Sequence, residues 1–360
     1  MSDPRPAPDL EQLKEFSKRV FGTLDGAVTA ALIHLGDRLG LYRQLADGGP
    51  ASSQELAERT GLHERWLREW LYNQGASRLL ECLPEGRFGL SPAGCAVLAQ
   101  EHHPAFGAGM FSQLPQTLGV AERLAEAFRT GVGLPYDAFG PEGARGVERG
   151  FAPWYRNFLV PLAIGGTQGL RSRLEAGGSV ADIGCGGGVA LLELSRAFPS
   201  AELHGWDISE HALARAEQNR AAAGAANVTF HDARTDPLPT DERFDLVITF
   251  DCLHDMTHPQ DVVCAIRAAL APDGVWLIAD IKSYGSFEEN LENNPMSAMM
   301  YGFSVLTCMS SALSEADGAG LGTLGFHEQL AREMTEAAGF TRFRRMDLEH
   351  PVNAFYEVRP

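Results

Sequence analysis

Hydrophobic residues in the first hundred positions recur at the spacing of helices. Between Phe21 and Leu45 the pattern is almost unbroken, with apolar side chains at Val28, Ala31, Leu32, Leu35, Leu39 and Leu41. Such a wide apolar stripe predicts a helix that packs against a second chain. A capped helix start at 51–58, a turn at 60–62 and a second helix at 63–74 follow, and 79–91 has the pattern of a β-hairpin wing. This order predicts a winged helix-turn-helix module.

Beyond Gly178 the pattern changes to strands that alternate with helices, which predicts a mostly parallel sheet with helices on both faces. A final antiparallel pair of strands is expected after the last helix. The expected strands lie around 180–183 and 205–207 and at 227–230, 244–250, 275–281, 341–348 and 353–358. The expected helices are 189–198, 211–223 with Ser209 as its cap, 259–270, 294–311 and 326–338, and Pro272-Asp273-Gly274 is expected to form a turn.

A less regular stretch, residues 101–177, joins these two parts. It contains expected helices at 119–130 and 147–174, separated by a glycine-rich and aromatic loop at 131–140. Loops of this kind often form pocket walls, although a plain surface connection has the same composition. Aromatic residues near 151–158, including Trp154 and Tyr155, are either core or a wall for a planar substrate.

Length and composition indicate a soluble two-domain protein. The chain has 360 residues, 44% of them hydrophobic, and no apolar run near the twenty residues that a membrane span requires. Residues 1–8 lack an apolar segment, so they predict a short disordered lead and not a signal peptide. The six cysteines show no C-x-x-C pair and no metal-ligand spacing, which predicts reduced, mostly buried thiols and no metal site. A cytoplasmic protein that does not bind membranes is expected.

Charge argues against a nucleic-acid partner. The formal net charge is −17, and residues 52–100 carry six acids (Glu55, Glu58, Glu64, Glu69, Glu81, Glu85) against five bases (Arg59, Arg65, Arg68, Arg78, Arg87). DNA-binding modules usually have a basic face, because phosphate contacts supply most of their affinity. The winged-helix pattern therefore predicts a dimerisation domain, with a DNA-binding regulator as the alternative.

The glycine-rich run from Asp182 to Gly188 indicates a cofactor site. It follows a strand and precedes a helix, and Asp207 ends the next strand. Glycines let the backbone approach a ligand, and an acid placed at Asp207 can accept hydrogen bonds from two ribose hydroxyls. A dinucleotide fingerprint would need a third glycine where Val189 or Leu191 stands. The pattern therefore predicts a cofactor that contains a nucleoside, and the sequence lacks the fingerprint of a dinucleotide site.

The D-x-G-x-G-x-G motif of residues 182–188 resembles the first motif of class I S-adenosylmethionine (SAM) dependent methyltransferases, and the strand order over 173–360 is similar to their seven-stranded sheet. The resemblance implies a Rossmann-like α/β domain with an antiparallel terminal strand and SAM as cofactor, released as S-adenosylhomocysteine (SAH). It divides the chain into a winged-helix dimerisation domain (1–100), a helical connector (101–177) and a SAM-binding domain (178–360). The implied cofactor contacts are Asp182, Gly184, Cys185, Gly186, Gly188, Asp207, Ile208, Asp232, Ala233, Phe250 and Asp251.

His254 and Asp255, after the fourth strand of the sheet, are the candidate catalytic residues. An oxygen nucleophile must lose a proton, and a histidine oriented by a carboxylate can take it. O-methyltransferases of plants and of polyketide pathways have His-Asp-Trp in this place, but here the sequence is His254-Asp255-Met256. His254 could also line the pocket or cap a helix, His258 is a rival base, and Asp255 could orient the histidine or cap the helix that begins at residue 259.

The resemblance further implies a substrate wall in the helix at 294–311, where Met299, Met300 and Phe303 either face the substrate or pack in the core. His327, at the start of the last helix, could also face the pocket. The expected protein is a homodimeric methyltransferase that acts on a small, partly apolar or aromatic acceptor, with O-methylation as the leading chemistry. The alternatives are N- or C-methylation of a small molecule and a SAM-binding winged-helix regulator. An RNA methyltransferase is disfavoured by the charge and by the absence of an Asn-Pro-Pro-Tyr type motif.

Overall fold

The computed structural model describes residues 9–360, and the expected N-terminal lead at residues 1–8 lies outside the described residues. Contacts within the chain divide it into two compact units, of which the first ends at Leu114 and the second runs from Pro115 to Pro360. Each unit has a hydrophobic core of its own.

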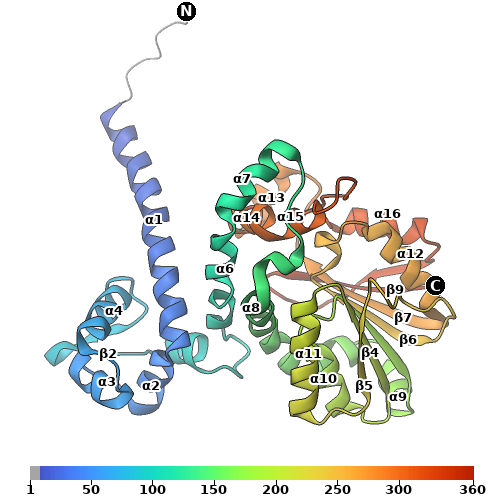
Figure 1. Ribbon diagram of the computed structural model, residues 1–360, viewed down its shortest axis with the longest axis horizontal. Coiled ribbons are helices and arrows are strands. Elements are labelled where there is room, and N and C mark those ends of the chain that lie inside the picture. Colours follow the sequence, from blue (N-terminus) through green and yellow to red (C-terminus); the bar gives the residue numbers. More distant parts are fainter. Residues whose placement is uncertain (1–8) are drawn as a thin grey trace, which may run out of the picture. The chain divides into compact units, whose positions relative to one another are not determined.

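The long apolar pattern near the N-terminus forms two helices, α1 (Leu10–Arg38) and α2 (Leu41–Gly48), where the sequence predicted one. The break lies at Gly40, whose φ of 71° belongs to the left-handed region that ends helices and suits glycine. Helix α1 begins at Asp9, whose carboxylate accepts a hydrogen bond from Gln12 N. The N-terminal turns of α1 project beyond α2–α4, as Figure 1 shows, and its apolar residues there are exposed.

The rest of the first unit confirms the winged-helix prediction. Helix α3 (Ser53–Thr60) begins with a capping box between Ser52 and Glu55, and α4 (Glu64–Ala76) is capped by His63. Strands β1 (Glu81–Leu83) and β2 (Arg87–Gly89) pair antiparallel around a turn, η1 (Pro84–Gly86), to form the wing. The short helices α5 (Pro92–Gly94), η2 (Cys95–Ala99) and η3 (Ala108–Phe111) complete the unit.

A seven-stranded sheet organises the second unit, in the order β5-β4-β3-β6-β7-β9-β8. The pairs among β3 to β7 are parallel, and β7–β9 and β8–β9 are antiparallel, which confirms the predicted Rossmann-like fold. The strands are β3 (Ser179–Ile183), β4 (Glu202–Asp207), β5 (Val228–Asp232), β6 (Phe244–Phe250), β7 (Leu270–Ile281), β8 (Arg342–Arg345) and β9 (Asn353–Arg359). The expected turn at 272–274 lies inside β7, where the pairing with β6 is irregular.

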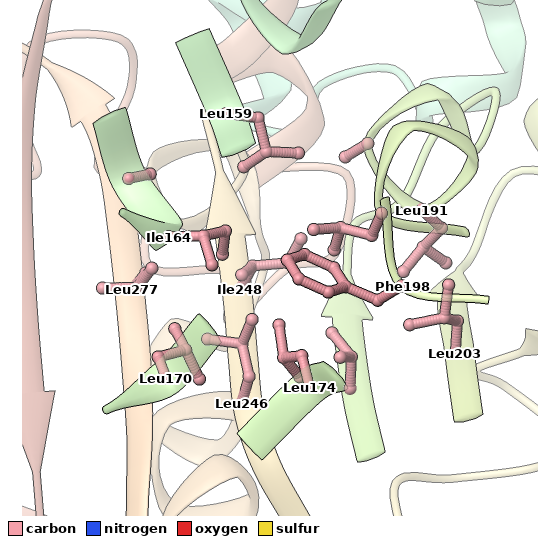
Figure 2. Packing of buried hydrophobic residues seen from close by; sticks show 14 of the residues in the cluster. Leu159, Ile164, Leu170, Leu174, Leu191, Phe198, Leu203, Leu246, Ile248 and Leu277 are labelled. Carbon is pink, nitrogen blue, oxygen red and sulfur yellow. The ribbon is translucent and has the colours of Figure 1, made fainter. Parts of the chain in front are cut away.

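Helices cover both faces of this sheet (Figure 1). Alternate strand residues point to opposite faces, so Val180 and Leu246 pack with α9 (Leu170–Glu175) and α10 (Val189–Ala197), while Ala181 and Val247 pack with α12 (Pro259–Ala269) and α16 (Glu328–Ala337). Figure 2 shows the first of these layers, in which leucine and isoleucine side chains from strands and helices surround Phe198. Helix α11 (Glu210–Ala223) packs beside β4 and β5 and begins at Ser209 as predicted.

The connector is more broken than the sequence predicted. The first expected helix, 119–130, forms as α7 (Ala121–Thr130), and a further short helix, α6 (Leu114–Gly119), precedes it. The second expected helix, 147–174, is replaced by α8 (Gly140–Trp154), a π-helix η5 (Tyr155–Ile164) and α9, with η4 (Tyr136–Phe139) before them. Residues 165–169 separate η5 from α9, and Gly169 has a left-handed φ of 76°.

The segment after β7 contains α13 (Phe287–Asn293), α14 (Ser297–Phe303), a π-helix η7 (Ser304–Cys308) and α15 (Met309–Ala312). All six cysteines lie within the described residues and are free thiols, but only Cys185 and Cys252 are buried, so the expectation that most are buried is wrong. Among residues 9–360, no helix is long and apolar enough to cross a bilayer.

We expect Leu246→Ala to destabilise the second unit by about 2–5 kcal/mol, because Leu246 is 0% exposed within the layer in Figure 2 and truncation leaves a cavity. Urea denaturation followed by far-UV circular dichroism measures the change. Leu291→Ala is the matched control, since that leucine of α13 is 63% exposed and should change the unfolding free energy by less than about 0.5 kcal/mol. Equal effects of the two substitutions would contradict the assignment of this core.

Candidate active site

Three glycines in the loop after β3 have backbone conformations that favour glycine. Gly184, Gly186 and Gly188 have φ values of 74°, 53° and 72°. A Cβ at Gly184 would lie 2.7 Å from Cys252 Cβ, and one at Gly188 would lie 2.4 Å from the Phe230 ring. At Gly186, by contrast, a Cβ would meet no protein atom within 4 Å. The loop is therefore packed tightly at both ends and borders open space at its middle, as a ligand cradle requires.

Asp207, at the end of β4, is joined to this loop by hydrogen bonds. Its Oδ2 accepts from Gly186 N at 2.8 Å and its Oδ1 accepts from Ser209 N at 2.8 Å. Burial raises the pKa of Asp207, and these backbone N–H groups act in the opposite direction. A carboxylate has about four acceptor positions, so each oxygen can still accept a ribose hydroxyl. The arrangement fits the diol of the expected cofactor.

A buried acid beside the loop makes the site suitable for a cation. Asp182, in β3, is 3% exposed, and burial together with the charge of Asp207 raises its pKa to about 8. A positively charged ligand would stabilise such carboxylates in their charged form. SAM carries two positively charged groups, a sulfonium and an ammonium, so the buried acids Asp182 and Asp207 are compatible with SAM as the ligand.

Helix α8 holds the glycine loop from one side. Glu148 accepts two hydrogen bonds from Arg215 of α11, at 2.6 and 3.0 Å, and one from Asn219 at 2.9 Å. Asn219 also donates to the carbonyl oxygen of Gly187 at 2.9 Å. A Cβ at Gly187 would meet Glu148 Oε2 at 2.7 Å. The loop is thus fixed by a charged cluster that no sequence motif predicts.

The residues expected near the adenine are arranged less simply. Asp232, which ends β5, is held by Arg234, whose Nε and terminal nitrogen donate to its two oxygens at 2.9 and 2.8 Å and lower the pKa of the acid. A contact of Asp232 with the adenine amino group would therefore share this carboxylate with Arg234. Ala233 N donates to the carbonyl oxygen of Asp207 at 3.0 Å, and Ile208 is 51% exposed beside that acid.

His254 lies in the short helix η6 (Leu253–Asp255), which follows β6, and forms a buried pair with a carboxylate of β7. Its Nδ1 lies 2.6 Å from Oδ1 of Asp280, at the end of β7, and the two side chains are 4% and 2% exposed. Burial by itself lowers the pKa of the ring, but Asp280 and a contact with Cys308 outweigh it, so the pKa of His254 lies well above its usual range. With Nδ1 engaged, Nε2 is the nitrogen that can exchange a proton with a substrate.

Two further acids surround this pair. Asp251 adopts a left-handed φ of 53°, and its carboxylate accepts a hydrogen bond from Asn353. Burial and the neighbouring Asp280 raise the pKa of Asp251. Burial likewise raises the pKa of Asp255 to about 7, although the His254 charge acts against it. The N-cap of α12 is His258, so Asp255 does not cap that helix.

The aromatic residues before the cofactor domain pack against strand ends. Trp154 stacks on Phe355 with centroids 5.2 Å apart, and Tyr155 stacks on Phe250 at 5.9 Å. In the later segment Met300 is buried with Ile281 and Leu324, Phe303 is partly buried, and Met299 is 47% exposed. Contact of any of these side chains with a substrate stays a prediction.

The other two histidines considered from the sequence have local partners. His258 lies at the surface, with Nε2 3.3 Å from Glu315 Oε2 and 3.8 Å from Asp317 Oδ1. His327 caps α16, and its Nδ1 accepts a hydrogen bond from Leu330 N at 3.3 Å.

Sequence reasoning missed Asp280 and Tyr136. Asp280 ends a buried strand, as Asp207 does, and that signal could have identified it. Tyr136 lies in an irregular loop with no motif, yet burial and the nearby charges of Asp255 and Asp207 raise its pKa well above the usual range. Tyr136 directly precedes Asp137, whose carboxylate accepts a hydrogen bond from Ser209 beside Asp207.

Two segments of the chain match known protein families. Residues 174–343 match a family described as "Methyltransferase domain". Residues 27–99 match a family described as "Rv2258c-like winged HTH domain".

The chain is also similar to characterised enzymes. It is 32% identical over 260 residues to the tetracenomycin polyketide synthesis 8-O-methyl transferase TcmO of Streptomyces glaucescens, covering 67% of this chain and 72% of that protein. Its fold is similar to human N-acetylserotonin methyltransferase in complex with SAM, with a TM-score of 0.69 at 15% identity, covering 99% of both chains. The mitomycin 7-O-methyltransferase MmcR matches with a TM-score of 0.65 at 19% identity, covering 98% of this chain and 100% of that one.

Gly184→Ala is expected to weaken SAH binding at least about tenfold, because the added Cβ would clash with Cys252 and strain a left-handed residue. Isothermal titration calorimetry measures the affinity. Gly224→Ala is the matched control: Gly224 has a similar φ of 63°, but a Cβ there meets nothing within 4 Å, and it ends α11 at the far end from Ser209. Loss of SAH binding in both variants would attribute the effect to general backbone strain and contradict the role of the loop.

Proposed function

Because the chain belongs to the SAM-dependent methyltransferases, we propose that it transfers the methyl group to a hydroxyl of a small, partly apolar or aromatic acceptor, with His254 as the general base. The observation that carries the proposal is the buried hydrogen bond between His254 Nδ1 and Asp280 Oδ1. It fixes the ring, and Nε2 is the nitrogen that can take the proton of the acceptor hydroxyl. Transfer to oxygen benefits from a base, because a hydroxyl must lose its proton as it attacks.

Bound SAM supplies a methyl group on a sulfonium, and the sulfur leaves as neutral SAH. The chain's own residues position the reactants and move one proton. Asp207 and the glycine loop would hold the ribose and the amino-acid part of the cofactor. His254 Nε2 accepts the proton of the acceptor hydroxyl. Asp280 stabilises the resulting imidazolium, and Asp255, whose pKa burial raises to about 7, lies beside the His254 ring.

N- or C-methylation of a small molecule is the alternative within the same cofactor site. A neutral amine can attack before it loses a proton, so it depends less on a base in the transition state. The His254–Asp280 pair therefore supports the oxygen acceptor.

We propose that the winged-helix unit serves dimerisation and not nucleic-acid binding. The bases of α4 are paired with acids of the same helix, Arg65 with Glu69 at 2.6 Å and Arg68 with Glu64 at 2.7 Å. Arg87 of the wing pairs with Glu55 at 3.2 Å. These ion pairs reduce the charge available for phosphates and argue against the SAM-binding regulator.

An apolar stripe along α1 supports a homodimer. Residues at near-helical intervals along one face are 43–63% exposed, and they comprise Leu10, Leu13, Val20, Leu24, Val28, Leu35 and Leu39. A second copy of the same stripe would bury these side chains. We further propose that residues 101–177 form a helical connector and a pocket wall. We also propose that the protein is located in the cytoplasm, because a reducing compartment keeps its six cysteines as free thiols.

His254→Ala should lower the turnover of an accepted acceptor by about 10²–10⁴-fold, because the hydroxyl loses its base. Transfer of labelled methyl from SAM to a panel of small phenols and to a metabolite extract measures it. His258→Ala should leave turnover unchanged, since this exposed histidine pairs with Glu315. The reverse pattern would make His258 the base.

The pH profile tests the same pair. His254 is a base only when neutral, and its raised pKa keeps it protonated at low pH, so the rate should rise with pH through that pKa. Asp280→Asn removes the carboxylate that stabilises the charged ring, so the rising limb should shift to lower pH while the plateau rate falls. An unchanged limb in this variant would remove Asp280 from the mechanism.

The double substitution Leu13→Glu with Leu24→Glu should convert the dimer to a monomer, because it places charges in the centre of the α1 stripe. Size-exclusion chromatography with light scattering measures the mass. Arg19→Glu, on the opposite face of α1, should leave the dimer intact. A wild-type monomer at micromolar concentration would contradict the proposed dimer.

A further inference from the structure

Residues 131–140 are hydrogen-bonded to α15 near their start and to Ser209, next to Asp207, further along. Glycines with left-handed φ values stand at both ends of this stretch, Gly131 at 77° and Gly140 at 66°. Near its start, Gly133 N donates to the carbonyl oxygen of Leu313 at 2.8 Å, and Leu134 N donates to Ser310 Oγ at 2.8 Å. This end of the stretch is therefore fastened to α15.

The contact with α15 depends on the absence of a side chain at Gly133. A Cβ there would lie 2.0 Å from the carbonyl oxygen of Ser310. Ser310 itself is 3% exposed, so its hydroxyl is available to Leu134 and not to bulk water. Helix α15 and η7 pack against η6, which carries His254. The first attachment thus reaches the acceptor side of the site.

The other attachment reaches the cofactor side. The Asp137 carboxylate accepts a hydrogen bond from Ser209 Oγ and another from Glu210 N at 3.2 Å. Ser209 in turn donates its backbone N–H to Oδ1 of Asp207 at 2.8 Å. A continuous chain of hydrogen bonds therefore runs from the ribose-binding acid through Ser209 to Asp137.

Tyr136 lies between these two attachments, directly before Asp137. The hydrogen bonds of Asp137 to Ser209 Oγ and Glu210 N therefore hold Tyr136 next to the Asp207 end of the site. Burial and the negative charges of Asp255 and Asp207 raise the pKa of its hydroxyl well above the usual range, so the phenol is protonated. A protonated phenol in this position can donate a hydrogen bond to an acceptor molecule.

We propose that residues 131–140 form a strap whose attachment through Asp137 lets cofactor binding lock Tyr136 in place for the acceptor. Asp137 is a positioning residue, and the inference rests on the proposed cofactor site at Asp207. A ligand shifts a conformational equilibrium towards the state that it binds more tightly. A cofactor bound to Asp207 therefore favours the state in which Ser209 is hydrogen-bonded to both Asp207 and Asp137. The strap therefore opens less often with cofactor bound, and acceptor binding follows cofactor binding.

Hydrogen–deuterium exchange of the full chain, with and without saturating SAH, tests the strap. In the wild type, SAH should slow exchange of the Gly133 and Leu134 amides by about tenfold or more. In Asp137→Ala this SAH-dependent difference should disappear. Asp347→Ala, which removes an exposed carboxylate between β8 and β9, should behave as the wild type.

A purely structural role for Asp137 would give a different result. Exchange in Asp137→Ala would then be faster with and without SAH, and the SAH-dependent slowing would persist, which would overturn the proposal. Calorimetric titration of SAH into the wild type distinguishes failure of the strap from failure of the proposed cofactor site. SAH binding without slower exchange of these amides would overturn the strap alone, whereas no SAH binding would overturn the proposed cofactor site and the strap with it.

Discussion

The parallel pairing of β3, β4, β5, β6 and β7 places the carboxyl ends of five strands at one edge of the sheet. Each of these strands ends in, or is followed directly by, an acid or the glycine loop. Asp207 and Asp232 are therefore direct partners on adjacent strands, and Asp280 lies at the same edge on β7, three strands from β4, although 25 to 73 residues separate these acids along the chain. Every contact of the site is built on this edge, since the hydrogen-bonded strands leave it little freedom to move.

Several buried acids at one edge carry an electrostatic cost, because desolvation disfavours their charged forms. The structure offsets part of it locally: Asp207 accepts two backbone N–H groups, Asp251 accepts from Asn353, and Asp280 holds the His254 ring. The raised pKa of Asp182 shows that the offset is incomplete. A cationic ligand would favour the charged form of Asp182, which fits the sulfonium and ammonium groups of the methyl donor.

Segments outside the sheet complete the site by fastening to this edge. Glu148 of α8 reaches Arg215 and Asn219 beside the glycine loop, and Asp137 reaches Ser209 beside Asp207. Both connections join the connector to the start or the middle of α11. The connector thus contributes side chains to a site whose motifs all lie in the sheet domain, which is why its irregular sequence belongs to the function.

The sequence by itself determined the winged-helix order, the Rossmann-like sheet, the methyl donor and the position of His254, because periodicity, capping residues and glycine spacing act over a few residues. Tertiary structure alone decided that Asp280 and not Asp255 bonds the His254 ring, that Arg234 is bonded to Asp232, and that Asp137 is bonded to Ser209 beside Asp207. It also broke two expected helices, at Gly40 and between residues 164 and 170. These outcomes depend on which strands become neighbours and on how loops pack across them, and no local pattern encodes such contacts.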